Sequence, residues 1–101
     1  MLARCRRQVM IAAFMLVASA GGASAQDVGD KLELCMSCHG ETGKPQLQGV
    51  PALAGRPAAD LAAQLGLFRN GTRQHQQMVM AKRLTDEEID ALAAYFARQA
   101  P

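Results

Sequence analysis

Two cysteines and a histidine stand close together in a chain that has little else with which to stabilise a small fold. Cys35 and Cys38 are separated by two residues, and His39 follows directly. The chain has no Trp, and the only other cysteine is Cys5. A small domain buries a low fraction of its surface and usually needs a disulfide, a metal or another staple. The chemistry of these three residues therefore decides what the chain can fold into.

The first 25 residues have the layout of a cleaved secretory signal peptide. Three arginines at positions 4, 6 and 7 precede an uncharged run, residues 9–20, and Ala23-Ser24-Ala25 forms an A-x-A cleavage site. The run is too short for a spanning helix, which needs about 20 apolar residues. We therefore expect a signal peptide over residues 1–25, a single domain over residues 26–101, and no stable membrane span after cleavage. The expected destination is the periplasm.

Removing this leader changes the charge of the chain. The whole sequence carries a formal charge of +2, but the 76 residues from Gln26 onward hold eight Lys and Arg against nine Asp and Glu. The formal charge of the expected domain is therefore −1. Because no basic excess remains, the charge excludes a nucleic-acid partner.

The pattern along the expected domain predicts helices and loops and no strand. The clearest helix follows Thr85, because Glu88 three residues later completes a capping box and apolar residues then recur at helical spacing. Proline and glycine mark the loops and the helix ends. The predicted helices are Val28–Cys35, Pro57–Arg69 and Thr85–Arg98, with a loop from Gly40 to Gly55 and a polar, irregular segment from Thr72 to Arg83. The predicted fold class is all-α.

The spacing of Cys35, Cys38 and His39 is compatible with several kinds of site. A thioredoxin-like dithiol needs a βαβ setting that this sequence lacks. A structural zinc site needs four ligands, and the only other histidine is His75. A disulfide between Cys35 and Cys38 would close a very small loop and so remove little entropy from the unfolded chain.

A covalently bound haem explains more of the sequence. C-x-x-C-H is the attachment signature of c-type haem: the two thiols add to the porphyrin vinyl groups, and the next residue binds the iron. A porphyrin would also supply the bulky apolar centre that an alanine-rich domain lacks. One haem c, attached at Cys35 and Cys38 with His39 as proximal iron ligand, is therefore the predicted cofactor.

From about Gly29 to Gln99, the chain resembles class I c-type cytochromes, in particular small monohaem members of the c4/c553 type and the cytochrome subunits of flavocytochrome c. The stretch CMSCHGETG resembles the haem-attachment region of this family. VPALAGRPAADLAAQLGLFRNGTR resembles its loop and middle helix, and LTDEEIDALAAYFARQ resembles its last helix. The resemblance implies three main helices and loops wrapped around one covalently bound haem.

The resemblance also implies roles for single residues. Pro51, twelve positions after His39, matches the proline whose carbonyl accepts a hydrogen bond from the proximal histidine. Gly29 and Tyr95 match positions where the first and last helices cross, the glycine leaving room for an aromatic ring. For Tyr95, core packing is the only role that the resemblance implies.

The distal iron ligand is where the sequence departs from the family. A methionine usually stands seven residues before the leucine that matches Leu84, but that position holds Gln77. Met78 is one residue away and is the preferred ligand; Met80 is the alternative, and it would otherwise pack in the core. His75 as a second histidine ligand, or an open iron site, would be the remaining possibilities.

The resemblance implies a one-electron carrier that shuttles electrons between larger redox proteins and is not an enzyme. The alternative is a cytochrome subunit held tightly by a dehydrogenase, such as a flavoprotein that oxidises sulfide. The first predicts a monomer and the second a stable complex. The sequence contains no acid–base pair or nucleophile arranged for catalysis.

Overall fold

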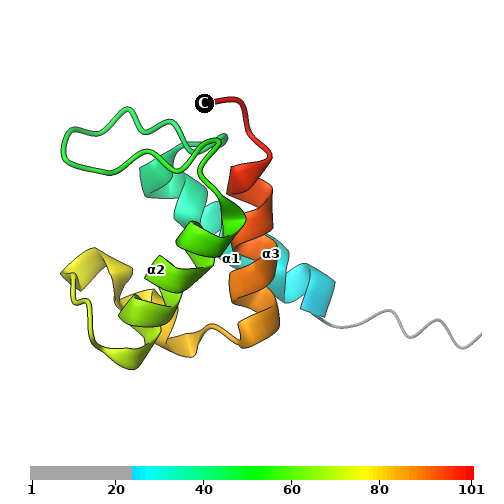
Figure 1. Ribbon diagram of the computed structural model, residues 1–101, viewed down its shortest axis with the longest axis vertical. Helices are drawn as coiled ribbons and strands as arrows, with labels where there is room; N and C mark the ends of the chain where they lie inside the picture. The colour runs from blue at the N-terminus through cyan, green and yellow to red at the C-terminus, as the bar shows by residue number, and fades with distance from the viewer. Residues whose placement is uncertain (1–23) are drawn as a thin grey trace, which may run out of the picture.

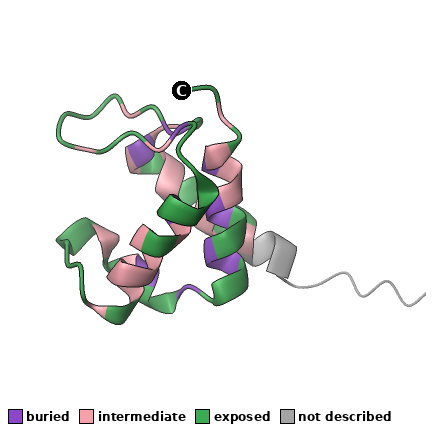
Figure 2. Ribbon diagram, viewed as in Figure 1, coloured by how far each residue is buried: buried purple, intermediate pink, exposed green. Residues whose placement is uncertain are grey.

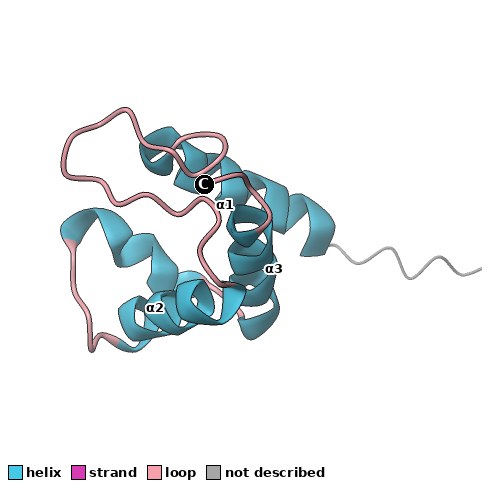
Figure 3. Ribbon diagram, turned by 45° about the horizontal axis from the view of Figure 1, so that its top comes forward, coloured by secondary structure: helices cyan, strands magenta, loops and turns pink. Residues whose placement is uncertain are grey.

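A computed structural model describes residues 24–101 of the chain. The predicted signal peptide, residues 1–25, lies almost wholly outside the described residues. Within the described part there are helices and loops and no strand (Figures 1 and 3), so the all-α prediction is confirmed. The elements are α1 (Ser24–His39), α2 (Ala58–Asn70), the 3-10 helix η1 (Gln76–Arg83) and α3 (Asp86–Ala97).

Helix α1 is longer than the sequence predicts. The sequence predicts Val28–Cys35, but the helix begins at Ser24 and continues to His39, so the whole C-x-x-C-H motif lies in its last turns. It ends at Gly40, where φ is +86° and the backbone N–H donates to the carbonyl of Met36 (2.9 Å). A left-handed glycine after the last helical residue is a common helix ending. One rigid element therefore carries both thiols and the imidazole.

Helix α3 forms as its capping signal predicts. The Thr85 side chain accepts a hydrogen bond from the Glu88 N–H (3.1 Å), and the Glu88 carboxylate accepts one from the Thr85 N–H (2.9 Å). The buried apolar residues of α3 are Ile89, Leu92, Ala93 and Phe96, one face of a helix.

The segment predicted to be irregular, Thr72–Arg83, contains the 3-10 helix η1, and this prediction is therefore wrong for Gln76–Arg83. His75 caps η1, its Nδ1 accepting from the N–H of Gln77 (3.2 Å). Only Ala81 of η1 is buried. A polar segment with three residues per turn leaves no apolar pattern with a period of 3.6, so the sequence gives little signal for it. Helix α2, in contrast, matches its prediction to within one residue at each end.

The core is thin and is formed by two clusters of buried side chains (Figure 2). Leu92 of α3 is the largest fully buried side chain in the described part of the chain. Leu32 and Cys35 of α1 pack against both clusters. The clusters consist of Ala81, Leu84, Ile89 and Leu92, and of Leu61, Ala93 and Phe96.

The contact between α1 and α3 differs from the one that the family resemblance implies. A Cβ built on Gly29 would meet nothing within 4 Å, so this glycine makes no room for an aromatic ring. The two helices are joined instead by an ion pair in which the Lys31 ammonium donates to the buried Glu88 carboxylate. Tyr95 does pack in the core, edge-on to Phe96 with ring centroids 5.0 Å apart.

The loop over residues 40–55, hereafter the proximal loop, and η1 project from the same side of the molecule (Figure 1). Among the helices of residues 24–101, α2 packs against both α3 and η1, whereas α1 approaches only α3 at the level of the backbone. The backbones of α1 and η1 thus do not approach one another closely, although Leu32 and Cys35 of α1 pack against the cluster that contains Ala81 of η1.

Candidate haem-binding site

The end of α1 presents two thiols and an imidazole from consecutive turns. Cys35 and Cys38 are both free and half-buried, and His39 is buried, with 8% of its surface exposed. Because all three lie on one helix, the backbone fixes their spacing before any cofactor is attached.

The ring of His39 is oriented by the proximal loop. Its Nδ1–H donates to the carbonyl of Pro51 (2.9 Å), the partner that the family resemblance implies. With Nδ1 occupied as a donor, Nε2 is the ring nitrogen that can bind a metal. A histidine held in this way has a fixed tautomer and is a better electron donor to a metal.

The Cys35 thiol does not have the character of a catalytic redox thiol. Burial raises the pKa of the Cys35 thiol, and the nearby Cys38 adds to this rise. Catalytic dithiols need the opposite, a pKa lowered by positive charge or by a helix N-terminus, and this motif lies at a helix C-terminus. Within residues 24–101 no group of three or more His, Cys, Asp or Glu residues is placed to hold a metal ion by itself.

A cavity of about 440 Å³ lies between the end of α2 and η1. Met78 and His75, two of the candidates for the distal ligand, line it together with Phe68 of α2. Met80 is placed differently, since it packs against the core cluster around Ala81 and Leu84. The structure therefore brings Met78 to a cavity wall and Met80 into the core.

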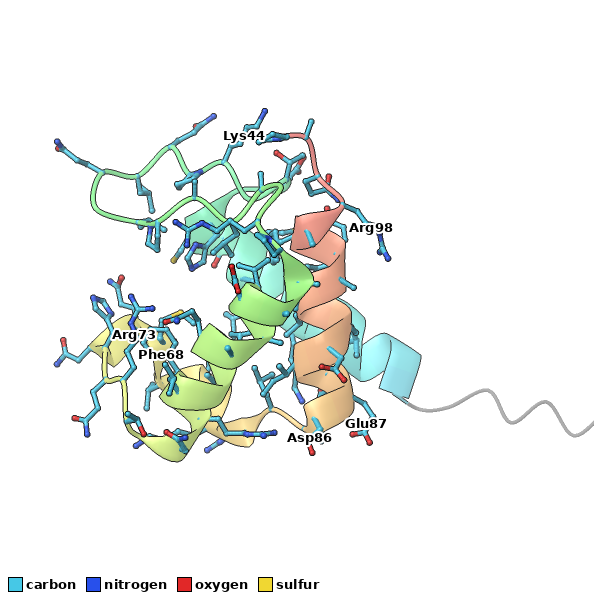
Figure 4. All side chains as sticks on the ribbon, in the orientation of Figure 1. Lys44, Phe68, Arg73, Asp86, Glu87 and Arg98 are labelled. Carbon is cyan, nitrogen blue, oxygen red and sulfur yellow. The ribbon has the colours of Figure 1, made fainter. Side chains whose placement is uncertain are left out.

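Arg73 shapes the same cavity, and its contacts are not evident from the sequence. Its guanidinium stacks on the ring of Phe68, 4.6 Å from the ring centroid, and donates to Oε1 of Gln64 (2.6 Å). Figure 4 shows Phe68 and Arg73 side by side at the end of α2. The sequence does not predict these contacts, because Arg73 lies outside the helix that carries Phe68 and Gln64 and belongs to no motif with them.

The hydroxyl of Tyr95 makes another contact that the sequence does not predict. It donates to the carbonyl of Glu41 in the proximal loop (2.6 Å). The pattern of α3 indicates a core position for the ring, but no local signal says where a hydroxyl at the edge of the core will bind.

These features fit a covalently held haem. The thiols are free and Nε2 of the buried histidine is available to a metal. The cavity lined by Met78 is a separate feature, because no residue of the C-x-x-C-H motif lines it. The fold and site define a small all-α protein of the kind that binds haem through C-x-x-C-H. The model of the cytochrome c family matches residues 27–99, and the chain belongs to this family. Its cofactor is covalently attached haem c.

Several known cytochromes are similar to the chain. The cytochrome c-554(548) of Halomonas halodenitrificans is 34% identical, with 79% of this chain and 99% of the relative aligned. The thiosulfate dehydrogenase electron acceptor of Stutzerimonas stutzeri is 35% identical over 73% of this chain, and the cytochrome c4 of Thiocapsa roseopersicina is 38% identical over 65%. The chain spans only 41% and 34% of the lengths of these two relatives.

None of the helices over residues 24–101 is long and apolar enough to cross a membrane.

Proposed function

We propose that this protein is an exported one-electron carrier that shuttles electrons between larger redox proteins. The observation that supports this most is the end of α1, where two free thiols precede a buried histidine whose Nδ1 is already bound to Pro51. When bound, the haem iron supplies the chemistry by alternating between the ferrous and ferric states.

The proximal side of the proposed site is built from α1 and the proximal loop. Cys35 and Cys38 would form the two thioether bonds, and His39 would bind the iron through Nε2. The Pro51 carbonyl holds the imidazole ring and strengthens it as an electron donor.

Met78 is the proposed distal ligand. It lines the cavity between α2 and η1, whereas the alternative, Met80, is packed against the core. A thioether and an imidazole together favour ferrous iron relative to two imidazoles, and this raises the reduction potential. His75 also lines the cavity, but its Nδ1 accepts the hydrogen bond that caps η1, so in the neutral ring Nε2 carries the proton and has no lone pair for iron.

With His39 and Met78 as its two protein ligands, the iron would have no position open to a substrate. We therefore propose that the protein is not an enzyme; the relatives include two named as electron acceptors, which supports a carrier role. The proposed destination is the periplasm, reached through a signal peptide cleaved after Ala25, as the layout of the leader indicates.

The function is tested on the protein purified from a host that attaches c-type haem. The haem should remain with the polypeptide after acid–acetone extraction and should cycle reversibly between two oxidation states under spectroelectrochemical titration. The double variant Cys35→Ala/Cys38→Ala should lose its haem on extraction. A colourless wild-type protein, or a haem that cannot be reduced and reoxidised reversibly, would refute the proposal.

A second candidate role is that of a subunit held by a dehydrogenase. Two relatives are named thiosulfate dehydrogenase electron acceptors, which favours a dehydrogenase as electron donor; a flavoprotein that oxidises sulfide is the form suggested by the resemblance. Haem staining of native complexes after affinity purification from the source organism separates the two roles. A monomeric haem band supports the free carrier, and a stable larger complex supports the subunit.

A further inference from the structure

The last turn of α3 contacts the proximal loop near both of its ends. The Tyr95 hydroxyl donates to the carbonyl of Glu41 (2.6 Å), and the N–H of Gly55 donates to the carbonyl of Phe96 (3.0 Å). Glu41 is only two residues beyond His39. Figure 1 shows the end of α3 beside the loop.

The two arms of the loop are also held to each other. The carbonyl of Gly43 accepts hydrogen bonds from the N–H groups of Leu53 (2.8 Å) and Ala54 (3.2 Å). A Cβ on Gly43 would lie 2.7 Å from the backbone nitrogen of Ala54 and 2.9 Å from the Phe96 ring, and the φ of Gly43 is +83°. Only glycine allows this approach. The arms are therefore packed against one another and against α3.

Pro51 lies within this closed arrangement, two residues before Leu53. Pro51 is itself exposed, so burial does not hold its carbonyl in place. The Pro51 carbonyl accepts from the Nδ1–H of His39, and the loop arms on either side of it are anchored. One continuous path of hydrogen bonds and short chain segments leads from Tyr95 through Glu41 and Gly43 to Pro51.

We propose that Tyr95 is a positioning residue for the proximal histidine. Its hydroxyl anchors the proximal loop, and the loop in turn keeps the Pro51 carbonyl on the Nδ1–H of His39. This inference rests on the proposed function in one respect, that His39 is the iron ligand. It goes beyond core packing, because the contact that matters is the hydroxyl rather than the ring.

The direction of the effect follows from the hydrogen bond. A carbonyl on Nδ1–H makes the imidazole a stronger donor and stabilises ferric iron. Loosening the loop weakens this bond, which raises the reduction potential and lets the Nδ1–H proton exchange faster with water.

The test compares Tyr95→Phe with Thr85→Ala. The first removes only the hydroxyl and keeps the ring against Phe96. The second removes the cap at the opposite end of α3, so it destabilises the same helix without touching the loop. Both are compared with the wild-type haem protein.

The two readouts are the exchange rate of the His39 Nδ1–H by nuclear magnetic resonance and the reduction potential. The exchange is measured on the ferrous protein under carbon monoxide. The ferrous iron is then low-spin whether methionine or carbon monoxide occupies the distal position, so the proton signal can be compared between variants. Tyr95→Phe should speed the exchange by about two- to tenfold, the effect of losing one ordinary hydrogen bond, and raise the potential. Thr85→Ala should lower the unfolding temperature and leave both readouts at wild-type values.

Unchanged exchange and potential in Tyr95→Phe would overturn the proposal, as would equal shifts in Thr85→Ala. If instead the proposed function is wrong, the wild-type protein itself would give no signal for an iron-bound His39. The assignment of His39 as ligand and this inference would then both be refuted.

Discussion

Met78 and Met80 are two residues apart, yet replacing them should have different consequences. Met78 is half-buried and lines the cavity beside η1, but it does not pack against either core cluster, so Met78→Ala should remove the proposed sulfur ligand and no core packing. Met80 is partly buried against Ala81, Leu84, Ile89 and Leu92. Met80→Ala should therefore remove packing and leave the iron ligands unchanged.

The magnitude for Met80 follows from its burial. Truncating a fully buried methionine to alanine costs about 2–5 kcal/mol, and a partly buried side chain forfeits about half of that, or ~1–2.5 kcal/mol. In a domain of this size each kcal/mol lowers the unfolding temperature by about 4–8 °C. Met80→Ala should thus unfold about 4–20 °C below wild type.

The assay pairs thermal unfolding with the absorption spectrum of the ferric protein. The weak far-red band from sulfur to iron(III) should vanish in Met78→Ala, which should also bind carbon monoxide or cyanide and have a lower potential. The band should persist in Met80→Ala. If the band is lost in Met80→Ala instead, Met80 is the ligand; if neither variant changes it, His75 becomes the candidate and the argument for a high potential falls.

Three further predictions concern stability. The Lys31 ammonium that donates to Glu88 holds the pKa of that carboxyl below its ordinary value of 4.5. The ion pair therefore stabilises the fold fully above about pH 4.5, and this stabilisation is lost as the pH falls through the lowered pKa of Glu88. Glu88→Gln should therefore be less stable than wild type at pH 7 and converge with it in acid; a gap that stays constant with pH in urea titrations would contradict this. Leu92→Ala should lower the free energy of unfolding by about 2–5 kcal/mol because the Leu92 side chain is fully buried. Chemical denaturation checks this beside the exposed-site control Ala91→Gly, which costs about 1 kcal/mol; a loss in Leu92→Ala no larger than in the control would contradict the prediction. The polypeptide without haem should be largely unstructured, since helices this short are marginal alone; a cooperative helical transition of Cys35→Ala/Cys38→Ala in far-ultraviolet circular dichroism would show that the protein core suffices.

The parts of the fold that the sequence predicts are those encoded by local signals. The capping box at Thr85 and the apolar spacing after it define α3 because both act within one helix. The C-x-x-C-H motif from Cys35 to His39 likewise predicts haem c, because its residues are contiguous in the sequence. The extent of α1 was underestimated, because Gly40 and not the first cysteine ends the helix.

The contacts that the sequence does not predict join residues far apart in the chain. Lys31 and Glu88 are 57 positions apart, and Tyr95 and Glu41 are 54 apart. Nothing local distinguishes Glu88 as both a capping residue and an interhelical partner. The sequence suggests a close helix crossing at Gly29, but a Cβ built there would meet nothing within 4 Å. The distal side remains a prediction for a similar reason: spacing alone leaves Met78 and Met80 nearly equivalent, and only tertiary packing separates them.

The two sides of the proposed iron site are carried by different parts of the protein. Helix α3 is joined to α1 by the ion pair between Glu88 and Lys31, and to the proximal loop by the Tyr95 hydroxyl. Met78 lies on η1, whose backbone approaches α2 and not α1. Because a hydrogen-bonded path fixes His39 while a polar 3-10 helix carries Met78, weakening η1 should release the sulfur before the histidine moves. Mild denaturant should therefore abolish the far-red band at concentrations where the signal of the His39 Nδ1–H persists, and simultaneous loss of both would show that the two sides unfold as one unit.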